Sequence, residues 1–396
     1  MKALIILLIA LVLYSIPVVS HLFHTSFYDS VEGVVTWHSS VLANTSYAQF
    51  YQKSLEVKAP PLYGFIGYFL VDAFHIFTEA ITRGRLLACL SQILIVLYLI
   101  GLCKQHKINQ FYVLLWLFFL PVIHLGWTFR FDNTALLFTI ISFHLYSQSS
   151  EMPTKWMHNL SLFLSTLFMT LALNTKFTIG ISLFVTILIV LIKKRNFANL
   201  KFYLFSLLTL ITLSLFLFQN ITQGLYIKSL LINNNPFSFY HFVDRSILIL
   251  IGTPIILIVF YLKNASFFDK TWWFVSGLIA FITLFKTGSN INYFLEFGFI
   301  SMLLFLKNKP KIIFSTPFKH FTACYLLLNL FIVLSIVKAN YNNLNINKQQ
   351  ILKIKQRPTL NSECLDSKNI KQSSLIVFSQ KKPCLPDPHI AQFLTK

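Results

Sequence analysis

The segment from residue 24 to residue 61, HTSFYDSVEGVVTWHSSVLANTSYAQFYQKSLEVKAPP, is the first long polar stretch of the chain, and an apolar run lies on each side of it. It carries Asp29 and Glu32 near its beginning and Glu56 and Lys58 near its end. Carboxylates are scarce, with 13 Asp and Glu among 396 residues, so two of them three positions apart are informative. Ionisable groups at a membrane edge are costly and are a functional hypothesis by default. The segment therefore predicts a loop between membrane helices that carries chemistry.

The composition of the whole chain agrees with this interpretation. Hydrophobic residues make up 56% of the sequence, charged residues only 12%, and 42 residues are Phe. These values exclude a soluble globular protein and predict an all-α polytopic membrane protein. The formal net charge is +20, but Lys and Arg lie in short clusters between apolar runs and near the end of the chain. Such clusters indicate contacts with membrane lipids and a defined topology, so we expect no nucleic-acid partner.

Twelve apolar runs are candidate membrane spans. The first, residues 1–20, also fits a secretory signal peptide, and we expect an uncleaved helix because an acidic loop follows it rather than a soluble domain. The runs lie at residues 1–20, 61–77, 86–103, 110–129, 133–148, 159–173, 177–192, 202–219, 246–262, 271–285, 291–306 and 321–338.

Twelve simple crossings would place the basic clusters at 193–195 and 307–311 outside, which contradicts the positive-inside rule. One early run therefore fails to cross. It is either 61–77, which contains two glycines and Asp72, or 110–129, which Pro121 interrupts. The sequence leaves both alternatives open. The predicted fold has about 11 transmembrane helices plus one re-entrant or in-plane segment.

This topology defines two regions. Residues 1–338 form the transmembrane domain, with residues 20–60 as its first periplasmic loop, and residues 339–396 form a short periplasmic tail. We expect Cys364 and Cys384 of that tail to form a disulfide, because the periplasm is oxidising. The same topology brings six charged residues to one extracytoplasmic membrane surface. They are Asp29, Lys58, Arg130, Asp132, Lys176 and Lys286.

Asp29, Glu32 and Asp132 are the candidate catalytic carboxylates. A carboxylate near a low-dielectric boundary is a suitable general base, because partial desolvation raises its pKa. The alternatives are that Asp29 and Glu32 only solvate a loop, and that Asp132 is a helix cap paired with Arg130.

Basic residues near the run ends are candidate phosphate ligands. Lys58 precedes two prolines, and Lys176 lies in a short break between two apolar runs. The alternatives are a snorkelling lysine and a turn lysine. Residues 286–296, KTGSNINYFLE, place Lys286 in a small polar loop that opens a helix containing Glu296. Helix-start amides and hydroxyls suit a phosphate, and a Glu is too costly in lipid to have no role.

These motifs, in this order, resemble the GT-C superfamily of membrane glycosyltransferases that use polyprenyl-phosphate sugars. The protein mannosyltransferase and lipid A aminoarabinose transferase branch is the most similar, and the resemblance covers about residues 1–306. The corresponding elements here are an acidic pair after the first helix, a Glu-Lys-Pro-Pro-like element, an Arg at a helix start, an Asp opening a later helix, and a Thr-Lys-Gly-like turn. The acidic pair is Asp29 with Glu32, and the Glu-Lys-Pro-Pro-like element runs from Glu56 to Pro61. The Arg is Arg83 or Arg85, the Asp is Asp132, and the turn is Thr175-Lys176. The sequence departs from the family where Val57 and Ala59 interrupt the second element and where Phe177 follows Lys176.

The resemblance implies inverting transfer of a sugar from a polyprenyl phosphate to a hydroxyl of a lipid, glycan or protein. The active site would face the periplasm from the bacterial inner membrane. Asp29 would be the general base, with Glu32 and Asp132 positioning it or the acceptor. Donor phosphate would be bound by Lys58, Arg130, Lys176 and Lys286, and Glu56, Asn292, Tyr293 and Glu296 would complete the site. No cofactor is implied with certainty, and a divalent cation stays open.

Two other classes remain as alternatives. A lipid-linked oligosaccharide polymerase or ligase would share a periplasmic polar site, but its large late periplasmic loop corresponds here only to the modest segment 220–245. A transporter or flippase would show internal repeats and charges near the bilayer midplane, whereas the charges here lie at run ends.

Overall fold

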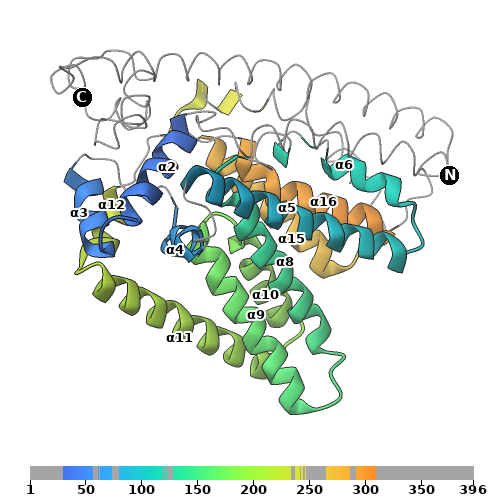
Figure 1. Ribbon diagram of the computed structural model, residues 1–396. Helices are drawn as coiled ribbons and strands as arrows, with labels where there is room; N and C mark the ends of the chain where they lie inside the picture. Colours follow the sequence, from blue (N-terminus) through green and yellow to red (C-terminus); the bar gives the residue numbers. More distant parts are fainter. Residues whose placement is uncertain are drawn as a thin grey trace, which may run out of the picture.

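A computed structural model describes residues 30–56, 61, 63–73, 80–117, 119, 121–122, 128–232, 237–240, 242–243, 246, 265–285 and 291–308 (Figure 1). The elements within these residues are all helices, which confirms the predicted all-α class. They are α2 (Ser30–Leu42), α3 (Tyr47–Glu56), α4 (Phe65–Ala73), α5 (Ala80–Gln105), η1 (Gln110–Val113), α6 (Leu114–Leu117), α8 (Asp132–Ser149), α9 (Lys155–Thr175), α10 (Ile181–Lys193), α11 (Phe197–Ile221), α12 (Leu225–Ile232), α15 (Phe267–Leu284), η3 (Ile291–Phe294) and α16 (Leu295–Asn308).

Four of the described helices, α5, α9, α11 and α15, are long and apolar enough to cross a membrane. This agrees with an association with membranes. The predicted total of about 11 crossings also counts runs 1–20 and 321–338 and most of 246–262, which lie outside the described residues, so that total stays a prediction. The tail at 339–396, with Cys364 and Cys384, lies outside them as well.

Polar caps start three of the helices at one end of the bundle. The Thr154 side chain accepts a hydrogen bond from the Met157 amide at the start of α9. Asn196 does the same for α11, and Ser266 for α15. Each cap satisfies a helix-start amide that has no intrahelical partner.

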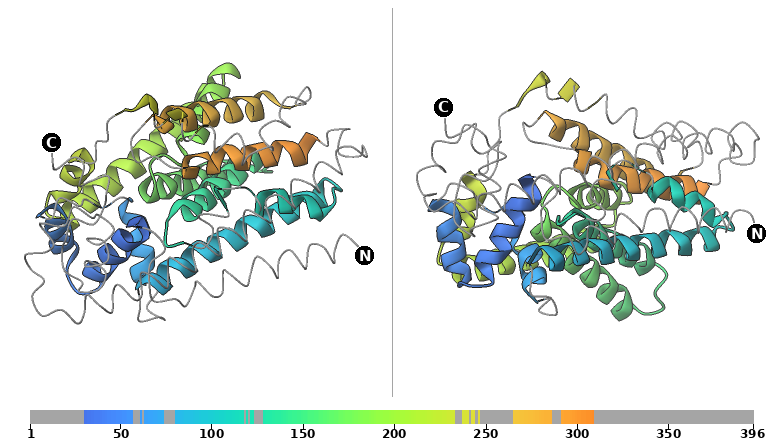
Figure 2. Two further views of the ribbon diagram at one scale, coloured as in Figure 1. Left: turned by 90° about the horizontal axis from the view of Figure 1, so that it is seen from above. Right: turned by 45° about the horizontal axis from the view of Figure 1, so that its top comes forward.

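Small polar residues join the central helices. Ser142 of α8 and Ser165 of α9 each donate a hydrogen bond to the other's carbonyl oxygen, at 2.8 and 2.9 Å. Helix α5 runs beside α8 in the same direction, because Ser91 meets Thr134 at 3.0 Å and Tyr98 meets His144 further along both helices. Helix α16 contacts both α15 and α5 (Figure 2). Close small-residue contacts of this kind are typical of helices packed in a membrane.

The bundle has two chemically different ends. We call the end where Glu32, Arg85, Asp132 and Lys176 lie the paired-charge end. We call the opposite end the basic end, defined by Lys193, Lys194, Arg195, Lys270 and Lys307. Helix α10 connects the two, since it begins just after Lys176 and ends at Lys193. The 21 residues of α9 set a separation of roughly 30 Å.

The segment 110–129 passes from the basic end to the paired-charge end. The Tyr112 ring contacts Phe305 near the end of α16, and the Trp116 ring contacts Phe299 at 6.0 Å, closer to the start of α16. The Phe129 amide then bonds to Glu32 at the paired-charge end. Within the described residues the segment begins with η1 and α6, and its two ends contact opposite ends of the bundle, while the predicted break at Pro121 stays a prediction.

The segment 61–77 behaves differently. Helix α4 has only 9 residues, which corresponds to a length of about 13 Å, well short of a bilayer core. The Gly64 amide just before it bonds to the Thr175 carbonyl oxygen at the paired-charge end. Helix α5 also begins at that end, where Arg85 meets Glu32. Of the two alternatives, the contacts therefore favour 61–77 as the segment that does not cross.

An aromatic cluster holds the short helices α2, α3 and α4 onto the paired-charge end. Phe65 of α4 stacks on Phe218 of α11 at 4.2 Å between centroids, and Tyr51 of α3 contacts Tyr226 of α12. The same cluster includes Phe129 and Phe131, which precede α8. The predicted loop at 20–60 is therefore largely helical where it is described, and it packs against the residues that carry the site.

Candidate functional site

Residues 128–132 form the centre of the candidate site. The Phe129 and Phe131 rings are fully buried, and each occupies space that a glycine leaves open. A Cβ atom at Gly84 would lie 2.0 Å from the Phe129 ring, and one at Gly67 would lie 2.4 Å from the Phe131 ring. The two rings fix this short segment, and with it the backbone positions of Arg130 and Asp132.

Glu32 forms a buried ion pair with Arg85. The Arg85 Nε and Nη2 atoms each donate to one Glu32 carboxylate oxygen at 2.8 Å, and both side chains are fully buried. The Phe129 amide donates to the same carboxylate at 2.8 Å. Glu32 does lie in the first turn of a short helix, as expected, but it does not solvate a loop. Its oxygens are engaged, so the geometry suits a positioning role for Glu32 rather than that of a base.

Asp132 and Lys176 form the second buried ion pair. Asp132 is fully buried and accepts hydrogen bonds from the Lys176 ammonium, from the Tyr63 hydroxyl at 2.9 Å and from the Asn292 amide at 3.0 Å. Tyr63 lies just before α4, and Asp132 begins α8. Lys176 follows the end of α9, and Asn292 lies in η3. Five of the sequence-predicted residues thus lie in one region, namely Arg130, Asp132, Lys176, Asn292 and Tyr293.

Aromatic rings enclose the Lys176 ammonium. It lies 5.4 Å from the Tyr63 ring centroid and 5.0 Å from that of Tyr293. Burial lowers the pKa of Lys176 below its usual value, and the neighbouring Asp132 carboxylate opposes that shift. Burial and the charge of Asp132 raise the pKa of Tyr63 well above its usual value, so its hydroxyl stays a neutral donor. The site is therefore a desolvated group in which charge interactions are strong.

Glu296 joins the beginnings of two helices. Its carboxylate accepts hydrogen bonds from the Gly180 amide at 2.9 Å, from the Ser182 hydroxyl, and from the Trp272 indole at 3.0 Å. These contacts tie α16 to α10 and α15, about one turn beyond Asn292. The functional role predicted for Glu296 stays a prediction, and in the described part of the chain its carboxylate bonds to Gly180, Ser182 and Trp272 rather than to Asp132 or Lys176.

The remaining predicted residues do not all join this group. Glu56 ends α3, is exposed, and accepts a hydrogen bond from Gln52 at 3.0 Å. Within the described residues its contacts do not connect it to Asp132. Asp29, Lys58 and Lys286 lie outside the described residues.

Sequence reasoning missed Tyr63, Ser182 and Trp272, and it named Arg85 only through the family resemblance. Tyr63 lies two positions after Pro61, the end of the Pro-rich element, and this was the one available signal. Ser182 and Trp272 lie in apolar runs, where neither residue stands out.

A metal centre is not visible in the described part of the chain, where no group of three or more His, Cys, Asp and Glu residues comes together. No protein-family model matches the sequence, and no curated protein or solved structure matches it significantly.

Proposed function

We propose that this protein is an integral membrane glycosyltransferase that moves a hexose or pentose from a polyprenyl-phosphate donor to a hydroxyl acceptor. The acceptor is a lipid, a glycan or a protein at the periplasmic face of the bacterial inner membrane. One observation carries the proposal: Asp132, Lys176, Arg130 and Asn292 converge at the end of the bundle opposite the exposed basic residues. The positive-inside rule assigns the basic end to the cytoplasm, so the paired-charge end faces the periplasm.

The charges of the site suit a phosphate leaving group. Lys176 and Arg130 contribute two cations against the single carboxylate of Asp132, which leaves one net positive charge in a desolvated region. Preorganised cations stabilise negative charge that develops in a transition state, and they act more strongly where water is excluded. Lys58 and Lys286, which the sequence motifs name, are proposed as further ligands of the donor phosphate.

The base of the reaction is assigned to Asp29. The neighbouring Glu32 is held by Arg85 and by the Phe129 amide, and this supports a fixed position for the start of α2 next to Arg130. Asp29 takes the proton of the acceptor hydroxyl, and the acceptor oxygen attacks the anomeric carbon. The bond from that carbon to the phosphate oxygen breaks from the opposite face with its electron pair, so the configuration inverts and polyprenyl phosphate leaves. Asp132 positions Lys176 and Asn292 during this step.

The test uses purified protein in lipid nanodiscs with a panel of polyprenyl-phosphate sugars, and it measures release of polyprenyl phosphate. We expect release with one donor and a loss of roughly 100-fold in Asp29→Asn, the usual contribution of a general base. Lys194→Gln at the basic end is the matched control and should keep full activity. Movement of intact donor between leaflets without release would support a flippase instead. Transfer of a preassembled lipid-linked oligosaccharide would support a polymerase or ligase.

A further inference from the structure

An apolar groove lies on the outer surface between α10 and α15, away from the candidate site. Its volume is about 590 Å³. It is lined by Val185 and Ile189 of α10 and by Lys270, Thr271, Phe274, Val275, Leu278 and Ile279 of α15. On α15 the lining extends over ten residues, about 13 Å along the helix axis. The groove therefore follows the axis of α15, and its walls are almost entirely hydrocarbon.

Positive charge gathers at one end of this groove. Lys270 lines it, and Lys193 lies one turn beyond Ile189 on the same face of α10. The Lys193 ammonium lies 3.3 Å from the centroid of the Phe267 ring, one turn before Lys270 on α15. Both lysines are exposed. The charged end of the groove thus belongs to the basic end of the bundle.

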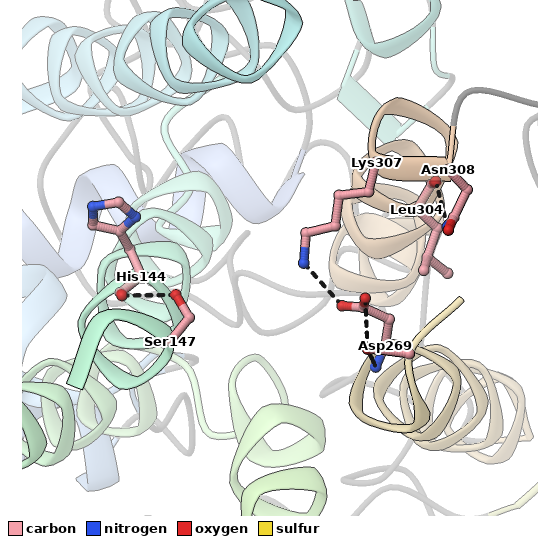
Figure 3. Close-up of polar contacts among 7 residues, drawn as sticks. His144, Ser147, Asp269, Leu304, Lys307 and Asn308 are labelled. Atoms are coloured by element: carbon pink, nitrogen blue, oxygen red, sulfur yellow. Dashed lines mark hydrogen bonds and ion pairs between the residues drawn. The ribbon is translucent and has the colours of Figure 1, made fainter. Parts of the chain in front are cut away.

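The nearby carboxylate does not neutralise these lysines. Asp269 lies in the first turn of α15, but its two oxygens accept hydrogen bonds from Lys307 at 3.0 Å and from Ser266 at 2.8 Å. Figure 3 shows the Lys307 side chain reaching from α16 to Asp269. Within the described residues neither Lys193 nor Lys270 forms a salt bridge, so both ammonium groups can contact an external partner.

We propose that this groove binds an anionic phospholipid of the cytoplasmic leaflet. One acyl chain lies along the groove between α10 and α15, and the phosphate of the headgroup contacts Lys193 and Lys270. Charge complementarity selects this occupant, since polybasic positions next to a membrane attract anionic lipids. A second copy of the chain on the same face would place equal positive charges against each other. The inference does not depend on the proposed transferase activity.

The test measures lipid bound to the purified full-length protein by native mass spectrometry. The probes are phosphatidylglycerol and phosphatidylcholine with identical acyl chains. Wild-type protein should bind phosphatidylglycerol more tightly, and Lys193→Gln/Lys270→Gln should weaken that binding about tenfold, since each lysine near the membrane surface contributes to it. Lys155→Gln/Lys201→Gln removes two exposed lysines elsewhere and should leave binding unchanged. Ile189→Trp fills the groove and should weaken the binding of both lipids.

Three outcomes would overturn the proposal. The first is equal binding of both lipids by the wild type, and the second is an equal loss in the Lys155/Lys201 control. The third is unchanged lipid binding in Ile189→Trp together with a shift from dimer to monomer, which would assign the groove to a second copy of the chain.

Discussion

Charged side chains are buried in pairs at one end of the bundle and exposed at the other. At the paired-charge end, Glu32 with Arg85 and Asp132 with Lys176 are withdrawn from solvent and engaged by several hydrogen bonds. At the basic end, Lys193, Lys194 and Arg195 are exposed. Burying an ion pair is often no more stabilising than apolar packing, whereas an exposed lysine costs almost nothing. Charges kept in buried pairs therefore point to a function, while the proposed orientation and lipid binding depend on the exposed ones.

The largest difference should appear when one arginine is removed at each end. Arg85→Gln leaves the Glu32 carboxylate buried without its cation, which should lower the free energy of unfolding by roughly 3–5 kcal/mol. Arg195→Gln changes an exposed side chain and should stay within about 0.5 kcal/mol. Reversible unfolding of the purified protein in mixed micelles measures both. Equal effects would mean that the two ends do not differ.

A second comparison, between a single and a double variant of the Asp132–Lys176 ion pair, separates the effect of this pair on stability from its effect on sugar transfer. Lys176→Met should destabilise the protein because Asp132 loses its cation, and the double variant Asp132→Asn/Lys176→Met should regain most of that stability. Sugar transfer should nevertheless stay about 100-fold or more below wild type in the double variant, because charge stabilisation of the leaving group is lost. A double variant that is stable and fully active would remove this pair from the mechanism.

A smaller effect is expected from two glycines of the same helix, α5. Gly84→Ala places a methyl group against the Phe129 ring and should cost about 1–3 kcal/mol. A Cβ atom at Gly101 has nothing within 4 Å, so Gly101→Ala should stabilise the helix by about 0.5–1 kcal/mol. Thermal unfolding of the two variants compares them. Similar melting temperatures would show that the Phe129 ring does not fix the site.

The helices that correspond to long apolar runs could be predicted from the sequence. The predicted run 133–148 corresponds to α8 at Asp132–Ser149, and the run 202–219 lies within α11 at Phe197–Ile221. Hydrophobicity of sufficient length determines such elements almost alone. The segment 110–129 was harder, because its helices are short and broken and its path depends on packing against α16.

The sequence identified individual residues of the candidate site, but it did not show which of them contact one another. Asp132, Lys176 and Asn292 stood out because polar residues are rare at run ends. The topology predicted a shared membrane surface for Asp132 and Lys176, but the direct pairings could not be predicted, since Asn292 is 160 positions from Asp132 and Arg85 is 53 from Glu32. Such pairs depend on how the helices pack, and one sequence contains no direct signal for that.

The central claim is that the paired-charge end faces the periplasm and the basic end the cytoplasm. Single-cysteine labelling in intact cells tests it most directly, in a variant whose five native cysteines are replaced by alanine. The probes are Asn44→Cys, in the exposed turn between α2 and α3, and Arg195→Cys, in the exposed turn after α10. A thiol reagent that cannot cross the membrane should label Asn44→Cys in intact cells, and Arg195→Cys only after the inner membrane is opened. Labelling of Arg195→Cys in intact cells, or of both sites from the same side, would contradict the account.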